Sequence, residues 1–262
     1  MHERERHRII LAEVAEKPVA TVSYLVELLE ASEATIRRDI SFLHKAGKLR
    51  KVRGGAESLH PPTSTSLAGR PFAISQTINA RAKRLVAREA AALCEEGESI
   101  IIGGGSTAYM MAEYLKNRQL HVMTNSFVIA DYLLKHSKCS VTLPGGKVYR
   151  EQNLILSPYP EDGSANFYAA RMFFGAQGVG PLGVMETDPQ IVQGTTRLLR
   201  QAEQRVLLVD SSKFSQRSSL IVCALSELDI VITDDGIDAK TQKLIEDAGC
   251  RLVISRAEAV AE

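Results

Sequence analysis

Apolar and polar positions alternate along this chain in two different ways, which divides the sequence into two parts. In the first 57 residues the apolar side chains recur every three or four positions, as in amphipathic helices. This pattern predicts helices over 4–15, 21–30 and 33–44. Ser32 is a suitable N-cap for the third helix, which carries Ile36, Ile40 and Leu43 on one face.

The outward face of that third helix and the segment after it are basic. Thr35, Arg37 and Arg38 lie outside the apolar stripe, and basic residues alternate with apolar ones from Lys48 to Arg53 before a glycine turn. Two helices joined by a short turn and followed by a basic hairpin are typical of a helix-turn-helix with a β-wing. The competing interpretation is a three-helix interaction module with a solvated basic face.

The distribution of charge favours the DNA-binding interpretation. The 262 residues carry a formal net charge of only +1, yet residues 31–57 hold seven basic and three acidic side chains. Locally concentrated positive charge is what binding to phosphates requires. The residues that we expect to contact DNA are Ser32, Thr35, Arg37, Arg38, Lys48, Arg50, Lys51 and Arg53.

A segment rich in proline, serine and threonine at 58–69 is typical of a linker, and it separates a DNA-binding domain at 1–57 from a second domain at 70–262. In the second domain a helix is predicted over 75–95, and short apolar strands then alternate with helices. Strands are predicted at 99–102, 120–124, 140–143, 171–174, 205–209, 229–233 and 251–254, and helices at 107–116, 127–136, 189–202 and 239–248. This alternation predicts an α/β fold with a parallel sheet covered on both faces.

Glycine, hydroxyl and amide residues gather where these predicted strands end. The first strand runs into three glycines and then into Ser106 and Thr107 at a helix start, an arrangement whose backbone N–H groups attract anions. Because parallel strands end at one edge of a sheet, these turns together predict a site for a small, phosphorylated, polyhydroxylated ligand. The expected contacts are Gly103, Gly104, Gly105, Ser106, Thr107, Thr124, Asn125, Gly145, Gly146, Lys147, Gly175, Ala176, Asp210 and Lys213. For each residue the alternative is a plain turn role.

The chain resembles the DeoR family of bacterial transcriptional regulators over nearly its full length, and three motifs carry this resemblance. They are 34–40 with Leu43 and Gly47, 52–56, and 208–214. The resemblance implies a winged helix-turn-helix joined to a domain like the ribose-5-phosphate isomerase fold. It also implies that a phosphorylated sugar or polyol modulates operator binding.

Two segments depart from the family pattern. Three glycines precede Ser106 where members more often have an acidic or amide residue, and 193–197 lacks the Glu and Lys that members commonly carry. Within the family, residues 156–158 and the start of the wing resemble the L-ascorbate utilisation repressor more than the glycerol-phosphate one.

The leading hypothesis is a repressor that reads operator DNA with Thr35, Arg37 and Arg38, holds phosphates with its wing, and responds to a phosphorylated effector. Because operators mirror protein symmetry, we expect a homo-oligomer. One alternative is a sugar-phosphate isomerase with a DNA-binding head. Isomerisation needs a carboxylate base, which leaves Asp188 and Asp210 because Gln177 stands where related isomerases carry an acid. A ligand-independent DNA-binding or oligomerisation module is the third class.

Other chemistry has little support in the sequence. Cys94, Cys139, Cys223 and Cys250 are scattered, which predicts reduced thiols in a cytoplasmic protein rather than a disulfide framework. The charged N-terminus does not resemble a signal peptide, and no apolar run approaches the ~20 residues of a membrane span. The histidines are isolated, so we expect neither a metal site nor a bound cofactor.

Overall fold

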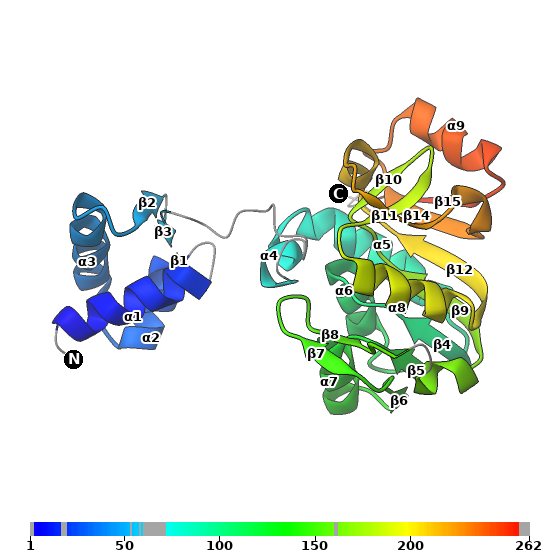
Figure 1. The fold of residues 1–262 in the computed structure, drawn as a ribbon, viewed down its shortest axis with the longest axis horizontal. Helices are drawn as coiled ribbons and strands as arrows, with labels where there is room; N and C mark the ends of the chain where they lie inside the picture. Colours follow the sequence, from blue (N-terminus) through cyan, green and yellow to red (C-terminus); the bar gives the residue numbers. More distant parts are fainter. Residues whose placement is uncertain are drawn as a thin grey trace, which may run out of the picture. The chain divides into compact units, whose positions relative to one another are not determined.

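The computed structural model describes residues 3–16, 20–52, 54–57, 59, 72–159 and 162–256. The chain forms two compact units, Met1–Ser66 and Leu67–Glu262, each with its own hydrophobic core (Figure 1). Apart from Leu59, the expected linker at 58–69 lies outside the described residues.

The first unit contains the predicted helices and wing. Its described elements are α1 (Glu3–Glu16), β1 (Ala20–Thr21), α2 (Val22–Leu29), α3 (Glu33–Lys45), β2 (Arg50–Val52) and β3 (Gly55–Glu57). The strands form an antiparallel sheet in the order β1-β3-β2. A Cβ on Gly55 would lie 2.4 Å from the carbonyl oxygen of Ala20, so the wing can pair with β1 only because this residue is glycine.

Helix α3 begins and packs as its sequence predicts. Ser32 Oγ accepts a hydrogen bond from the backbone N–H of Thr35 at 3.2 Å, which satisfies one of the free donors at the helix start. Ile36, Ile40 and Leu43 are buried in the core of the unit. The opposite face of α3 is thereby left to solvent.

Asp39 is a charged residue on the buried side of α3, and α1 supplies its partners. Its side chain is 4% exposed. Arg6 Nε donates to Asp39 Oδ2 at 2.8 Å, and His7 Nε2 lies 3.1 Å from Oδ1. The His7 ring also stacks on Phe42 with 5.1 Å between ring centroids. Asp39 therefore fixes α3 to α1.

The second unit is built on a seven-stranded sheet in which every neighbouring pair is parallel. The strand order is β15-β14-β12-β9-β4-β5-β6. The strands are β4 (Ser99–Ile102), β5 (His121–Thr124), β6 (Ser140–Thr142), β9 (Ala169–Phe174), β12 (Ala202–Leu208), β14 (Ile230–Asp234) and β15 (Arg251–Ser255). All seven predicted strands are present, and the predicted α/β class is confirmed.

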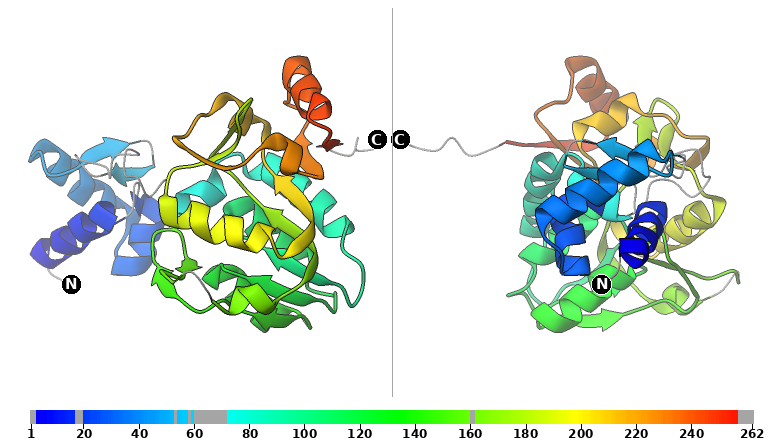
Figure 2. Two further views of the ribbon diagram at one scale, coloured as in Figure 1. Left: turned by 45° about the vertical axis from the view of Figure 1, so that its right-hand side comes forward. Right: turned by 90° about the vertical axis from the view of Figure 1, so that its left-hand side faces the viewer.

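Helices cover both faces of this sheet, as Figures 1 and 2 show for α5 and α8. They are α4 (Phe72–Thr77), α5 (Ala80–Ala92), α6 (Ser106–Tyr114), α7 (Phe127–His136), α8 (Pro189–Leu199) and α9 (Ala239–Asp247). Ile100 and Ile102 of β4 belong to the core cluster that includes residues of α5, α6 and α7, whereas Ile101 belongs to the cluster on the other face, which includes residues of α8 and α9. None of the helices in the described parts of the chain combines the length and the apolar character needed to cross a membrane.

The structure also contains elements that the pattern did not predict. They are β7 (Lys147–Tyr149), β8 (Leu154–Leu156), β10 (Gly178–Gly180), β11 (Gly183–Glu186), β13 (Leu220–Cys223) and the 3-10 helices η1 (Gly163–Asn166), η2 (Ser211–Ser215) and η3 (Leu225–Glu227). Strands of three or four residues are too short to show a periodicity. The helix predicted over 75–95 is divided at Asn79, whose left-handed conformation (φ 53°) separates α4 from α5.

We expect Asp39→Ala to destabilise the DNA-binding unit, because Arg6 and His7 lose their common acceptor. In a domain this small, the lost stability should lower the melting midpoint of the unit by about 5–10 °C. Glu33→Ala is the matched control, since Glu33 pairs with Arg37 on the exposed face of α3. Thermal unfolding of the full chain measures both variants, and equal effects would contradict the role of Asp39.

Candidate functional site: a helix-turn-helix face and an effector cavity

The exposed face of α3 carries the residues expected to meet DNA. Arg37 and Arg38 are exposed, and Thr35 is half-buried beside the Ser32 cap. Arg37 Nε donates to Glu33 Oε1 at 2.9 Å, so this guanidinium is already paired within the helix. No ion pair joins Arg38 to another of the described side chains.

The wing lies against the same helix. Lys51 Nζ donates to Ser41 Oγ of α3 at 3.0 Å, and Arg50 forms an ion pair with Glu57 across the hairpin. Lys48 is exposed just before β2. Arg53, the remaining expected contact, lies outside the described residues. The structure thus joins the basic residues of α3 and of the wing into one surface.

A cavity in the second unit lies where β4, β9 and β12 end. Its volume is about 90 Å³, which is smaller than the several hundred cubic ångströms typical of ligand sites. Eight of the expected effector contacts line it, namely Gly104, Gly105, Ser106, Thr107, Gly175, Ala176, Asp210 and Lys213. Phe72, Ser75 and Ile78, from α4 and the residue after it, also contribute to its wall.

The N-terminus of α6 forms one wall of the cavity. Gly105 occupies the N-cap position with φ 132°, a conformation that favours glycine, and no side chain caps the helix. Asn125 lies behind this turn and accepts a hydrogen bond from the N–H of Gly104 at 3.0 Å. The first N–H groups of α6 therefore have no helical partners, at the place where the sequence predicts an anion site.

Two lysines add positive charge to the same cavity. Lys83 of α5 is only 4% exposed, and its Nζ donates to the carbonyl oxygen of Ser75 at 2.5 Å. Lys213 lies in η2, with its Nζ 3.3 Å from Gln216 Oε1. A phosphate group bound at the start of α6 would meet both cations within one small cavity.

Two carboxylates, Asp210 and Glu186, line the cavity as well. Asp210 Oδ1 accepts hydrogen bonds from Asn79 Nδ2 at 2.8 Å and Ser212 Oγ at 2.5 Å. Glu186, at the end of β11, is 9% exposed. Burial raises the pKa of Glu186 to about 7, while the N–H of Thr187 and the charge of Lys213 act in the opposite direction.

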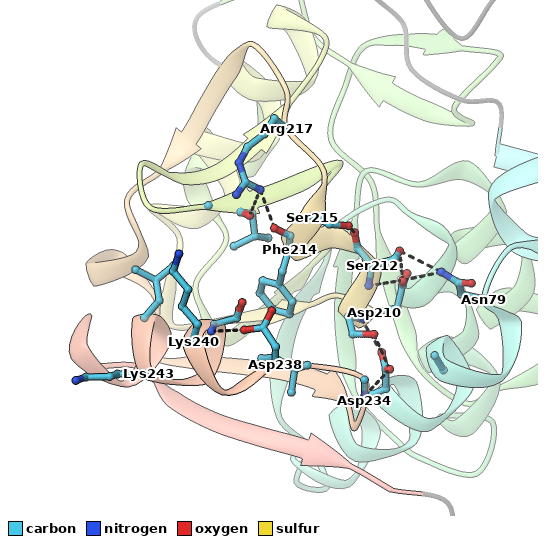
Figure 3. A pocket seen from close by; sticks show the side chains of 18 of the residues that line it. Asn79, Asp210, Ser212, Phe214, Ser215, Arg217, Asp234, Asp238, Lys240 and Lys243 are labelled. Atoms are coloured by element: carbon cyan, nitrogen blue, oxygen red, sulfur yellow. Dashed lines mark hydrogen bonds between the residues drawn. The ribbon is translucent and has the colours of Figure 1, made fainter.

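A wider groove of about 1010 Å³ shares the wall formed by Asn79, Asp210 and Ser212 (Figure 3). Its acidic residue Asp234 accepts hydrogen bonds from the N–H and hydroxyl groups of Ser211, at 2.6 and 2.8 Å. Arg217 donates to backbone carbonyl oxygens, including that of Val179 at 3.0 Å. These polar groups stabilise the turns between strand ends and helices.

Several expected contacts lie elsewhere. Gly103 donates its N–H to Phe173 O at 2.8 Å and continues the sheet, and the fully buried Thr124 accepts a hydrogen bond from Ser126 N at 3.0 Å. The turn with Gly145, Gly146 and Lys147 follows the edge strand β6, and Lys147 lines another small pocket. A Cβ on Gly146 would lie 2.6 Å from Leu156 O, so packing explains this glycine.

Lys83 and Glu186 are the charged residues of the cavity that were not predicted from the sequence. Lys83 is placed three and four positions before the buried Val86 and Ala87, so a cation interrupts the apolar stripe of α5. That signal was visible in the sequence. Glu186 ends a four-residue strand that has no recognisable pattern, and nothing in the sequence distinguishes it from a surface glutamate.

The departure at 193–197 has a structural explanation. Arg197 does not line the cavity; its guanidinium donates to the carbonyl oxygens of Ser157 and Tyr159 at 2.9 and 2.6 Å, and to Asp162 Oδ2 at 3.1 Å. A Cβ on Gly194 would approach Leu156 Cδ2 to 3.3 Å, so glycine also permits close packing of α8 here. This part of α8 therefore holds neighbouring segments together.

Family models match both units of the chain. The DeoR-like helix-turn-helix domain matches residues 6–62, and the DeoR C terminal sensor domain matches residues 78–235. The chain belongs to the DeoR family. It is thus a helix-turn-helix transcriptional regulator with a sensor domain, as the sequence motifs predicted.

Two relatives and one solved structure are similar to this DeoR-family protein. The HTH-type transcriptional regulators UlaR of Shigella dysenteriae and Escherichia coli K12 are each 32% identical over 254 residues, covering 97% of this chain and 99% of the relative. Ribose 5-phosphate isomerase A from Methanocaldococcus jannaschii is 22% identical and covers 52% of this chain and 55% of its own, with a TM-score of 0.39. The fold class rests on the parallel sheet itself.

The raised pKa of Glu186 predicts a pH-dependent stability. Between its ordinary pKa of 4.5 and about 7, the folded chain holds a proton that the unfolded chain has lost, so this contribution to stability disappears as pH rises through that window. Glu186→Gln should therefore unfold like the wild type near pH 4 and be about 2–3 kcal/mol more stable at pH 8. Urea unfolding measures the difference; Glu246→Gln, on the exposed face of α9, should have the same stability as the wild type at both pH values.

Proposed function

We propose that this DeoR-family protein is a repressor of a carbohydrate or polyol catabolism operon, and that a phosphorylated sugar or polyol binds its cavity and modulates operator binding. The observation that carries the proposal is the cavity itself. The uncapped start of α6, Lys83 and Lys213 provide positive potential in a small buried space. We propose that the protein acts in the cytoplasm, where operator DNA is its partner.

On DNA, Thr35, Arg37 and Arg38 would face base edges in the major groove, where arginine bonds guanine bidentately. Lys48, Arg50, Lys51 and Arg53 would contact phosphates, which fix the position of the protein without reading sequence. We also propose a homo-oligomer, because operators of helix-turn-helix proteins mirror the symmetry of the bound protein.

The small volume of the cavity suggests how ligand binding could affect DNA binding. Helix α4 covers the cavity and is the first described helix after the DNA-binding unit in the sequence. It is held by the bond from Lys83 to Ser75, by the bond from Phe72 N to Glu151 O at 3.0 Å, and by the Phe72 ring against Tyr109. We propose that a phosphorylated sugar, in filling this small cavity, displaces part of this wall and that α4 carries the change towards the linker.

Base contacts and phosphate contacts should respond differently to mutation. We expect Arg38→Ala to weaken operator binding about tenfold or more and to relax preference at one base pair, since a bidentate base contact supplies about 1–3 kcal/mol of discrimination. Lys48→Ala should weaken binding to operator and to random DNA by the same factor, and it should reduce the slope of log affinity against log salt concentration by about one. Fluorescence anisotropy with DNA from upstream of the gene measures both. Unchanged operator affinity in Arg38→Ala would refute the assignment of α3.

Removal of one cavity cation should weaken the effector response without affecting the DNA-binding unit. Lys213→Met is expected to bind phosphorylated sugars at least about tenfold more weakly, the usual loss for a charge-assisted contact, and to bind operator normally without ligand. Lys243→Met, an exposed lysine of α9, is the matched control. Calorimetry with a panel of tetrose, pentose and hexose phosphates and phosphorylated polyols measures the affinities.

The same samples test the role of α4. Amide hydrogen exchange over residues 72–77 should change when a phosphorylated ligand binds the wild type. Lys213→Met should show a smaller change at the same ligand concentration, because less of this variant is bound. Identical exchange with and without bound ligand in the wild type would contradict displacement of this helix.

A further inference from the structure

Glu186 is a buried acceptor in the cavity that the fold leaves without a full set of partners. Among the described residues its carboxylate accepts one hydrogen bond, from the backbone N–H of Thr187 to Oε2 at 3.3 Å. Asp210, the other carboxylate in the cavity wall, is bound by Asn79 and Ser212. A buried polar group without partners loses the hydrogen bonds that water would supply. A ligand in the cavity is the natural partner for Glu186.

The surroundings of Glu186 differ from those at the start of α6. The charged groups that act on it are Lys213 from η2 and Asp188, two residues further along the chain, while Lys83 and Asp210 line the same cavity. The positive charge of Lys213 does not overcome burial, because the pKa of Glu186 still rises to about 7. In its ionised form Glu186 repels an anion and attracts a hydroxyl donor.

These two chemistries orient a ligand that has one phosphate group. Its phosphate is attracted to the free N–H groups of Gly105, Ser106 and Thr107, and its hydroxyl end is left for Glu186. A ligand with phosphates at both ends would place the second one beside a buried carboxylate. Juxtaposed like charges in a desolvated site oppose binding strongly.

We propose that Glu186 selects monophosphorylated sugars or polyols, because it accepts a hydrogen bond from a free hydroxyl group and repels a second phosphate. This selection rests on the proposed role of the cavity as the effector site. Specificity then comes from a repulsive element as well as from attractive ones. Lys213 offsets part of the repulsion between Glu186 and a second phosphate. Because the remaining repulsion needs the charged carboxylate, the selection grows as Glu186 ionises.

Ribulose 5-phosphate and ribulose 1,5-bisphosphate are a matched pair of probes, since they differ by one phosphate in place of a hydroxyl. By calorimetry on the full chain at pH 8, the wild type should prefer the monophosphate by about tenfold or more. Glu186→Gln keeps the shape of the side chain and removes its charge, and it should reduce this preference by about tenfold. Glu246→Gln applies the same chemical change on the exposed surface of α9 and should leave the preference intact.

The preference of the wild type relative to that of Glu186→Gln should also depend on pH. Lowering the pH from 8 to 6 protonates Glu186 and should weaken the discrimination against the bisphosphate. Phosphate groups of the ligands titrate in this range as well, with a second pKa of about 6. The ratio between wild type and Glu186→Gln at each pH removes that contribution, because both proteins bind the same ligands.

The outcomes separate this inference from the proposed function. Tight binding of the bisphosphate to the wild type, or an unchanged preference in Glu186→Gln, would overturn the role of Glu186 while the cavity remained an anion site. If neither ribulose phosphate nor inorganic phosphate bound the wild type, the proposed effector function would fail and the role of Glu186 with it. Loss of the preference in Glu186→Gln alone supports the inference.

Discussion

The parallel pairing of β4, β9 and β12 is the constraint on which the cavity depends. Ile102 of β4 is level with Phe173 of β9, and Phe173 is level with Val206 of β12, so the turns after the three strands meet at one edge. Those turns contain Gly104, Gly175 and Asp210 respectively, residues separated by up to about a hundred positions in sequence. The carboxyl ends of parallel strands lie at the same edge of a sheet, and ligands of such sheets bind at that edge.

Within that edge the distribution of charge gives the cavity its chemistry. The start of α6 and Lys83 favour an anion, whereas the buried Glu186 disfavours an anion and can accept a hydrogen bond from a donor group. We propose that a cavity with both properties distinguishes the two ends of a ligand. The DNA-binding unit uses buried charge differently, because Asp39 is fully engaged by Arg6 and His7 and serves to hold α3 in place.

Sequence patterns predicted the sheet well and the cavity in part. Strands and helices of the second unit follow from apolar runs bounded by glycine and hydroxyl residues, which reflect local preferences and burial. The same reasoning placed Lys147 and Gly146 at the ligand because their turn resembles the others. The strand before this turn, β6, lies at the edge of the sheet, and β5 separates it from β4. Strand order is set by contacts between distant segments, so a turn motif alone does not show which turns meet.

The sequence by itself determined the two-part organisation, the helix-turn-helix with its basic wing, the α/β class and the glycine-rich start of α6. Each of these depends on residues that are close in sequence, where periodicity, caps and turn chemistry act. Only the tertiary structure decided that Lys83 and Glu186 enter the cavity and that Arg197 does not. Lys83 of α5, Glu186 of β11 and Lys213 of η2 come together only in the folded chain. No local pattern records which charged side chain packing will remove from water.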